Sequence, residues 1–380
     1  MTTVFTVASV VLGAVVGSFL NACIHRMPRN ISLSNPKRSF CPSCNKIIPW
    51  YENLPIVSWV ALRGKCSTCG AGISPRYVFV EILTAVAFYF IWTRFGSPLA
   101  FAYWIFFALL IVATFIDIEH FIIPDEITWG GTAAGVIASL ALPSLMGTTS
   151  HLMSGLFSLL GAALGFGLLW LVVEGGKLAF GRKKHAFTTA EEFVWKRDGD
   201  RADLRLGDES LAWEEIFSRE TDVLVLDTEG DSKCGEQTFP QGPLRFTYNR
   251  LTVGELSFEL DTLDEIRGRV RAVVIPREAM GFGDVKFIAC IGAFLGWQAV
   301  LFTLFASSII GCVAGIAGIF IARDKSGARI PFGPFLALGA AIWVFGGNEI
   351  MDWYFSQFGA ANLLSSIVGF LRNLVAIPYV

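Results

Sequence analysis

The sequence is poor in charged residues and has no excess of basic ones. Asp, Glu, Lys and Arg together make up 16% of the 380 residues, and 53% are hydrophobic. An average soluble domain contains about 25% charged residues, and the mean hydropathy here is +0.56. This composition excludes an ordinary soluble protein and indicates a polytopic membrane protein. With 30 basic and 32 acidic residues the net charge is −2, so we expect no nucleic-acid partner.

The first residues also lack a basic segment. Met1 to Thr6 contain no Lys or Arg, whereas a cleavable secretory signal begins with a positively charged region. We therefore expect residues 4–24, which are largely apolar, to be a retained membrane span.

Eight apolar segments follow one another, and most approach the roughly 20 residues that a helix needs to cross a bilayer. The segment 285–295 is short, and one interpretation is a half-crossing held by its neighbours. The tail 361–378 is either a ninth segment or an interfacial helix, because it contains Arg372 and Pro378. The eight segments are 4–24, 77–95, 99–117, 126–143, 153–174, 285–295, 299–322 and 331–347.

The distribution of Lys and Arg predicts which side each connection faces, because basic connections stay in the cytoplasm. The region 25–76 holds eight Lys and Arg residues and 323–329 holds three, whereas 144–152 and 296–298 hold none. Eight crossings with the N-terminus outside satisfy all four connections. The ends of the segments 99–117 and 285–295 that carry Asp117 and Asp284 then lie at the cytoplasmic boundary.

Two polar regions interrupt the apolar segments. Residues 25–76 form the first, and residues 175–280, which carry both charge signs, form the second. We expect a polytopic α-helical membrane protein with a cytoplasmic metal-binding loop and an inserted β-rich cytoplasmic domain. The expected strands are Val223–Leu226, Leu244–Tyr248 and Val270–Ile275, and Leu211–Phe217 could be a short helix. The expected parts are 1–24 as the first helix, 25–76, helices within 77–174, the insert 175–280, helices within 281–348 and a tail 349–380.

Four of the eight cysteines form two CxxC pairs in the 25–76 region. Cys41 and Cys44 make the first pair, and Cys66 and Cys69 make the second. Each pair can place two thiolates on one tight turn, and two such turns complete a tetrahedral Zn²⁺ site without an open position. The alternatives are ordinary thiols or disulfides, and a cytoplasmic location disfavours disulfides. We predict a structural zinc ion that folds a region too short to bury a core of its own.

Two acidic residues stand at the ends of apolar segments. Asp117 ends the segment 99–117, and Asp284 follows Gly281-Phe282-Gly283 just before the apolar run Val285–Leu295. A carboxylate at the end of a membrane helix is costly to keep and is therefore a functional-site candidate. Two carboxyls that share a proton can hydrolyse a peptide bond, because the ionised one activates water and the protonated one polarises the carbonyl. Gly281 and Gly283 would let the backbone approach a substrate closely.

Each acid alone also has an ordinary explanation. Asp117 could end a helix in headgroup water, and Asp284 could cap the start of a helix. If the two form a pair, the dipoles of their own helices predict that Asp284 carries the negative charge and Asp117 the shared proton. Glu81, inside the second apolar segment, could pair with Arg76 or belong to the site.

Taken together, these features resemble the type IV prepilin peptidase family, the bifunctional leader peptidases and N-methyltransferases of bacterial pilus and type II secretion systems. The GxGD at 281–284 is shared with presenilin-like proteases, but the ordered set of motifs is specific to this family. The set runs from the first to the last apolar segment and leaves out the insert and the tail. It comprises Gly17-Ser18-Phe19-Leu20-Asn21 with Arg26 and Pro28, the two CxxC pairs, Pro75-Arg76-Tyr77 with Glu81, Phe115-Ile116-Asp117 with Ile123-Pro124-Asp125, Arg277 to Lys286, and Pro331-Phe332-Gly333-Pro334.

The resemblance implies that Asp117 and Asp284 are the catalytic pair of an aspartyl peptidase in the bacterial inner membrane, active on the cytoplasmic side. Its substrates would be prepilins or pseudopilins with a basic leader, a glycine before the cleavage site and an apolar helix. Glu119, Asp125, Glu126 and Glu174 could attract that leader. The resemblance also implies N-methylation from S-adenosylmethionine, with the 25–76 region as the implied place for it, although no glycine-rich nucleotide loop follows a predicted strand. A peptidase without methyl transfer is the alternative.

Other classes of function make different predictions. A transporter with intramembrane acids predicts carboxylates near the middle of the membrane and inverted repeats, and the sequence shows neither. An inactive assembly factor would not need both acids and all four cysteines. The 175–280 insert departs from the family, whose members usually have a short loop there. It could bind a substrate, partner or regulator, or be a tolerated insertion.

Overall fold

The computed structural model describes residues 2–35, 38–180, 182–198, 201–207, 209–217, 222–234, 237–276, 281–322 and 330–357. The chain divides into two compact units, one formed by Met1–Leu169 with Gly283–Val380 and the other by Trp170–Phe282. The first is helical and the second is rich in β-strands. The predicted tail segment 361–378 and the basic connection 323–329 lie outside the described residues.

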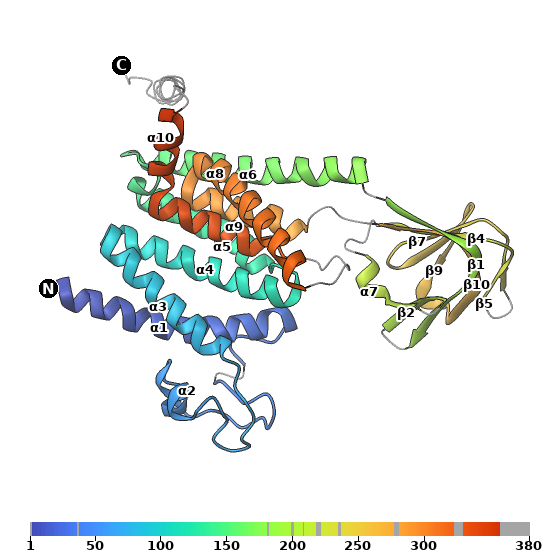
Figure 1. Cartoon of the computed structure of the whole chain (residues 1–380), viewed down its shortest axis with the longest axis horizontal. Helices are drawn as coiled ribbons and strands as arrows, with labels where there is room; N and C mark the ends of the chain where they lie inside the picture. The colour runs from blue at the N-terminus through green and yellow to red at the C-terminus, as the bar shows by residue number, and fades with distance from the viewer. Residues whose placement is uncertain are drawn as a thin grey trace. The chain divides into compact units, whose positions relative to one another are not determined.

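Every predicted apolar segment up to residue 347 is helical (Figure 1). A chain in lipid must satisfy its own backbone hydrogen bonds, and the α-helix does so within each segment. The long helices are α1 (Thr2–Arg26), α3 (Arg76–Phe95), α4 (Leu99–His120), α5 (Asp125–Ala141), α6 (His151–Phe180), α8 (Phe282–Ala322) and α9 (Gly333–Ile342), which continues through the π-helical turn η5 (Trp343–Gly347) into α10 (Asn348–Gln357). The short elements are η1 (Met27–Arg29), η2 (Trp50–Glu52), α2 (Val57–Ala61) and η3 (Pro143–Met146).

Six helices in the described part of the chain are long and apolar enough to cross a membrane. The expected count of eight differs at two places. α5 has 17 residues and is not among the six. α8 contains two predicted segments and counts once. Gly296 separates these two segments at φ 79° and ψ 178°, a backbone conformation that glycine adopts readily. The predicted break between 285–295 and 299–322 is confirmed, and eight separate crossings stay a prediction.

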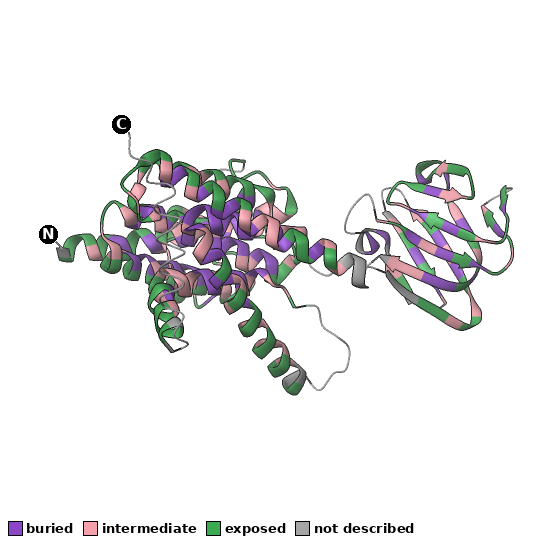
Figure 2. Cartoon of the chain, turned by 90° about the horizontal axis from the view of Figure 1, so that it is seen from above, coloured by how far each residue is buried: buried purple, intermediate pink, exposed green. Residues whose placement is uncertain are grey.

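The first half of α8 is the buried centre of the helical unit. Every residue from Phe287 to Phe294 is buried, and Figure 2 shows buried positions gathered in the middle of this unit. Phe294 packs against Phe106 of α4 with ring centroids 4.8 Å apart. The neighbouring helices therefore hold this short segment in place, as the sequence analysis anticipated.

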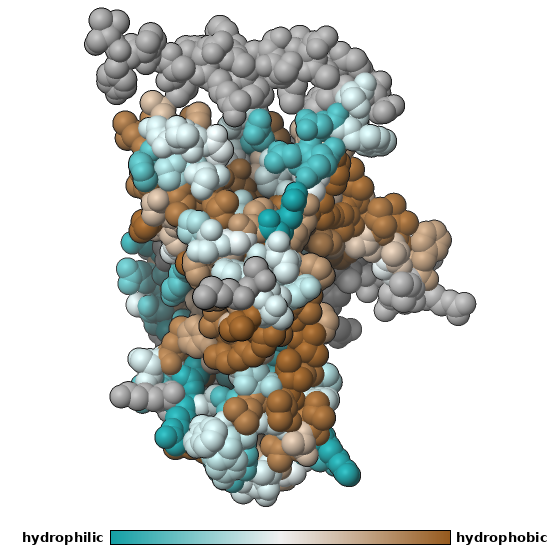
Figure 3. All heavy atoms as spheres, turned by 90° about the vertical axis from the view of Figure 1, so that its left-hand side faces the viewer, coloured by the Kyte–Doolittle hydropathy of each residue, from teal (hydrophilic) through white to brown (hydrophobic). Residues whose placement is uncertain are grey.

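Apolar side chains cover much of the outside of the helical unit. Val11, Ile137, Phe305 and Val313 are among the large apolar residues that are more than half exposed. Figure 3 views the molecule end-on and shows apolar surface running along its flank. Exposed apolar surface of this extent is what lipid-facing helices require.

α6 and α8 approach each other at two facing glycines. A Cβ at Gly161 would lie 2.3 Å from the Gly292 carbonyl oxygen, and a Cβ at Gly292 would lie 2.2 Å from the Gly161 carbonyl oxygen. Beside them, the Ser158 hydroxyl donates to the Ala293 carbonyl at 2.6 Å. Small residues permit such close approach, and polar side chains reinforce it, in membrane helix packing.

Gly161→Ala is expected to destabilise the helical unit by about 1–3 kcal/mol, which is the usual cost of overpacking. Gly167→Ala is the matched control, because a Cβ at Gly167 of the same helix meets nothing within 4 Å. Thermal unfolding of both purified variants in one detergent measures the difference. Equal melting temperatures for the two variants would contradict the packing argument.

The β-rich unit is one antiparallel sheet with the strand order β3-β2-β1-β10-β4-β7-β8-β9, and β5 pairs with both β10 and β6. Arg182 at the start of β1 pairs with Pro276 at the end of β10, so the inserted strands begin and end side by side. The strands are β1 (Arg182–Asp198), β2 (Arg201–Leu206), β3 (Glu209–Ala212), β4 (Leu224–Thr228), β5 (Ser232–Cys234), β6 (Gln237–Phe239), β7 (Pro243–Phe246), β8 (Arg250–Val253), β9 (Leu256–Glu259) and β10 (Glu265–Pro276), with short helices α7 (Trp213–Ile216) and η4 (Leu260–Thr262).

This unit has its own apolar core, in which Phe193, Trp195 and Phe246 are almost wholly buried. The predicted β-rich character is confirmed, and β4, β7 and β10 overlap the three expected strands with different ends. The helix expected at Leu211–Phe217 is only partly correct. Leu211 pairs with Leu204 across the β2–β3 hairpin, so the helix begins at Trp213 instead.

Candidate functional site

α4 and α8 place the two predicted acids in the interior of the helical unit. Asp117 lies in the last turn of α4 and is 5% exposed, and Asp284 lies in the first turn of α8 and is 8% exposed. The two carboxyls lie near enough for their charges to interact, so they would repel each other if both were ionised. Like charges this close favour one shared proton.

The beginning of α9 supplies a third part of this site. Gly333, the first residue of α9, donates its backbone N–H to Asp117 Oδ2 at 2.9 Å. A Cβ at this position would lie 2.7 Å from the same oxygen, so glycine leaves the space that the carboxylate occupies. In the sequence, Gly333 is visible only as part of the motif Pro331-Phe332-Gly333-Pro334. Its position between Pro331 and Pro334 was the available signal, since proline is common in the first turn of a helix.

The hydrogen bonds of the two acids differ. The partial positive charge at the start of α9 and the Gly333 N–H both stabilise an ionised Asp117. Asp284 Oδ1 is buried and has no hydrogen-bond partner among the described residues. The dipoles of α4 and α8 alone predict that Asp284 carries the charge. The contacts favour the opposite assignment.

Ile123, in the connection between α4 and α5, lies against both glycines of this site. A Cβ at Gly283 would lie 3.3 Å from Ile123 N, and a Cβ at Gly333 would lie 3.0 Å from Ile123 Cδ1. Ile123 is buried, so it is part of the packed surroundings of both glycines. Gly281, the other predicted glycine, is exposed and belongs to the β-rich unit.

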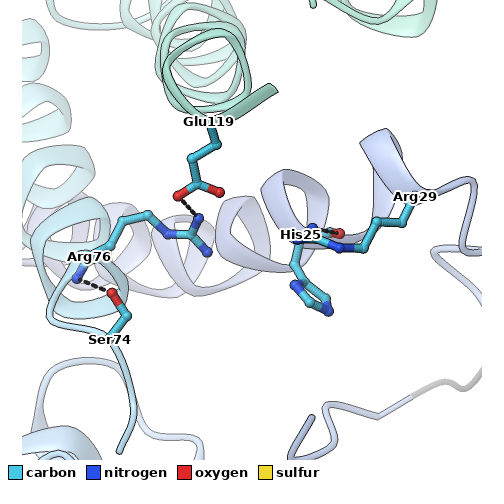
Figure 4. Close-up of polar contacts among 5 residues, drawn as sticks. All are labelled: His25, Arg29, Ser74, Arg76 and Glu119. Carbon is cyan, nitrogen blue, oxygen red and sulfur yellow. Dashed lines mark hydrogen bonds and ion pairs between the residues drawn. The ribbon is translucent and has the colours of Figure 1, made fainter. Parts of the chain in front are cut away.

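Two of the four acids expected to attract a basic leader already have partners. Glu119 forms an ion pair with Arg76 (Figure 4), and Asp125 accepts a hydrogen bond from Lys286 Nζ at 2.6 Å. Glu126 is exposed, and Glu174 belongs to the β-rich unit. A bound cationic leader would have to exchange with Arg76 or Lys286 at the first two of these acids.

Two basic residues lie beside helix ends, where Arg29 follows the end of α1 and Arg76 begins α3. Figure 4 shows the Arg76 side chain directed at Glu119 and, nearby, Arg29, which donates to the His25 carbonyl at 2.7 Å. Arg76 takes Glu119 as its partner, whereas Glu81 accepts the backbone N–H of Ile56 at 2.7 Å. Glu81 therefore ties the 25–76 region to α3, a contact that spacing in the sequence does not predict.

The four predicted cysteines meet in one cluster. Their Sγ atoms all lie within 4.8 Å of one another, and Sγ of Cys41 lies 3.8 Å from Sγ of Cys69. A tetrahedron with Zn–S bonds of about 2.3 Å has edges of about 3.8 Å. The cluster therefore fits a tetrahedral thiolate site, and a zinc ion matches both the donor set and its size.

The two cysteine turns repeat one backbone design. Asn45 donates its N–H to the Cys41 carbonyl at 2.8 Å, and Gly70 donates to the Cys66 carbonyl at 3.0 Å. The N–H groups of Cys69 and Thr68 lower the pKa of the Cys66 thiol to about 6, and those of Cys44 and Ser43 lower the pKa of Cys41. Thiolates are the metal-binding form, and the turns stabilise the thiolates of Cys41 and Cys66, whereas burial and the neighbouring thiols raise the pKa of Cys69 to about 11.

In the described part of 25–76, the β-structure consists of two isolated bridges, Phe40 with Ile47 and Lys65 with Gly72. A strand followed by a glycine-rich nucleotide loop is therefore absent from that part of the chain. Binding of S-adenosylmethionine there would need a site of a different kind.

Two family models match this chain. Residues 11–95 match the bacterial peptidase A24 N-terminal domain, and residues 104–190 and 253–316 match the type IV leader peptidase family. Together they cover more than half of the chain. The second match leaves out residues 191–252, which lie within the β-rich unit.

Curated relatives cover most of the chain. A prepilin leader peptidase/N-methyltransferase of Myxococcus xanthus (strain DK1622) is 29% identical to this chain over 326 residues. The match covers 86% of this chain and 66% of that protein. The chain is 28% identical to a protein of the same name from Aeromonas hydrophila, over 90% of this chain and 91% of that protein. A Pseudomonas aeruginosa protein of that name is 26% identical over 93% of this chain and 95% of that protein. No solved structure matches.

Proposed function

Since the chain belongs to the type IV leader peptidase family, we propose that it is a bifunctional membrane enzyme that removes the leader of prepilin-like proteins and methylates the new N-terminus. Its curated relatives are named for both activities. The observation that carries the peptidase half is the buried pair Asp117 and Asp284, contributed by two helices. Paired carboxyls shielded from bulk water are suited to peptide hydrolysis.

In the proposed mechanism, Asp117 is the ionised member and acts as general base. It takes a proton from a water molecule, whose oxygen attacks the scissile carbonyl carbon. Asp284 gives its proton to the carbonyl oxygen as the tetrahedral intermediate forms. Collapse of the intermediate breaks the C–N bond, and the leaving amine takes the proton that Asp117 has gained. Asp284 regains its proton from a hydroxyl of the intermediate as the new carboxyl group forms. The Gly333 N–H keeps Asp117 ionised and oriented between turnovers.

The four cysteines are proposed to hold a structural zinc ion. Cys41, Cys44, Cys66 and Cys69 would fill all four positions of a tetrahedral site, so the ion would fold the 25–76 region without binding a substrate. S-adenosylmethionine would supply the methyl group, and we assign no residue to it. The contact between Glu81 and Ile56 would hold the folded region beside α3.

The leader is proposed to bind on the cytoplasmic side. The many basic residues of 25–76 support this orientation through the positive-inside rule. Glu119 and Asp125 would then exchange their partners Arg76 and Lys286 for basic groups of the leader. Gly283 would leave room for the extended chain around the scissile bond.

Co-expression with a prepilin-like protein in a bacterium without its own leader peptidase tests this function. We expect the prepilin to lose its leader and its new N-terminal residue to gain one methyl group, both read by intact-mass spectrometry. Cleavage without the added methyl group would support a peptidase alone. A prepilin that stays full length beside well-expressed protein would overturn the proposal.

A further inference from the structure

An apolar groove of about 450 Å³ runs along the helical unit between α3, α4 and the helix formed by α9 and η5. α4 packs against both α3 and α9 (Figure 1), so α4 forms the floor and the other two form the walls. Among the described residues that line it, Thr114 alone has a polar side chain, and the others are Leu, Ile, Val, Ala and Phe. The groove therefore offers apolar contacts and hardly any hydrogen bonds.

Two of the three helices lead from the groove to the candidate active site. On α4, Leu110 and Thr114 line the groove, and Asp117 follows them by seven and three positions on the same helix face. On α9, Ala337 and Ala341 line the groove and follow Gly333 by four and eight positions, again on one face. The groove-lining faces of α4 and α9 therefore both lead to the hydrogen bond between Gly333 and Asp117.

The groove opens sideways to the lipid. Val86 and Phe90 on the α3 wall are 45% and 52% exposed, whereas the α9 wall opposite them carries the small side chains of Ala337 and Ala341. A wall of large residues facing a wall of alanines leaves room for side chains of a further helix. The stretch from Phe107 to Asp117 is about 15 Å long at 1.5 Å per residue, which matches roughly half of a bilayer core.

We propose that this groove binds the apolar helix of the substrate and delivers the residues preceding that helix to Asp117 and Asp284. This inference rests on the proposed function, in which the substrate is a membrane protein cut near the start of its helix. A helix in the groove would pack against α3 and α9 within the bilayer, and the chain leaving its end would reach the acids. Continuity of the groove with the acids distinguishes a substrate from a lipid chain, which would gain nothing from ending there.

Photo-cross-linking tests binding without requiring cleavage. A benzophenone amino acid is placed at Ala341, within the groove, or at Leu338, which is 47% exposed on the same helix and does not line the groove. Both are made in an Asp117→Asn background, so that bound prepilin stays uncut. We expect prepilin to be captured from position 341 and not from position 338.

A second variant measures the effect on turnover. Ala341→Trp fills the groove and is expected to raise KM for full-length prepilin by about tenfold or more, the change expected when roughly 1.4 kcal/mol of binding is lost. Its kcat should change little, because residue 341 lies two turns from Gly333. Leu338→Trp, with the same added bulk on the other face, should leave KM unchanged.

Equal capture from positions 338 and 341 would overturn the groove assignment, as would capture of another part of this chain or of lipid alone. An unchanged KM in Ala341→Trp would do the same. Failure of the proposed function looks different, because prepilin would then stay uncut by the unmodified protein as well. The two proposals can therefore fail separately.

Discussion

Asp117→Asn and Asp284→Asn are each expected to abolish prepilin cleavage, with rates at least about a thousandfold lower than those of the unmodified protein. An acid or base positioned in the transition state contributes about 10²–10⁴ in rate, and each asparagine removes a group that must gain or lose a proton. Both side chains keep their size, so folding should be retained. Cleavage is measured on detergent-solubilised protein with purified prepilin.

Asp352→Asn is the control for this pair, because Asp352 is an exposed acid on α10 of the same unit. It should cleave at the unmodified rate. Cleavage that persists in either Asp117→Asn or Asp284→Asn, at equal protein levels, would remove that residue from the catalytic pair. Loss of folded protein in either variant would be seen as an early, broad peak in size-exclusion chromatography and would require the glutamate variant instead.

The same two variants show which acid holds the proton. If Asp117 is ionised by the Gly333 N–H and the start of α9, the infrared band of the protonated carboxyl belongs to Asp284. It should then survive in Asp117→Asn and vanish in Asp284→Asn at neutral pH. The reverse pattern would restore the assignment made from the dipoles of α4 and α8 alone. The pair titrates as a unit, so the bands are compared between variants rather than assigned singly.

The helices and the cysteine cluster could be predicted because their signals lie within short segments of the chain. The apolar runs give the helices, and the turns around Cys41, Cys44, Cys66 and Cys69 give a cluster of the right size for zinc, because tetrahedral geometry leaves little freedom once two CxxC turns meet. Asp117 and Asp284 stand out because a charged residue at the end of a membrane helix is rare; their burial in one unit is observed, and their catalytic role stays a prediction. Hydropathy and spacing carry each of these signals.

What the sequence did not predict depends on contacts between distant segments. Gly333 and Asp117 are 216 positions apart, and Lys286 and Asp125 are 161 apart. Neither pair can be derived from the period of a helix, because the packing of separate helices sets it. The protonation assignment changed for this reason, since α9 adds a donor to Asp117 that its own helix does not reveal. The partner of Glu81 is similarly a backbone N–H of a remote turn rather than the nearby Arg76.

Cys66→Ser is expected to lose the zinc ion and, with it, methyl transfer, while prepilin cleavage continues. Structural zinc sites contribute apparent binding energies of about 10–16 kcal/mol to folding, far more than a region of this size gains from burying its own side chains. Three remaining cysteines cannot complete the tetrahedron. The zinc content of purified protein is measured by elemental mass spectrometry, and leader loss and methylation are read from the mass of the prepilin.

Cleavage is expected to continue because the contacts that place Asp117 and Asp284 come from α4, α8 and α9 and include no residue of the cysteine cluster. Cys312→Ser is the matched control, since Cys312 is exposed on α8 and should retain zinc and both activities. Methyl transfer that persists after zinc is lost would show that the 25–76 region does not carry that activity. Loss of both activities would instead mean that the link from Ile56 to Glu81 transmits the folding of this region to α3, so that the peptidase site also depends on the metal.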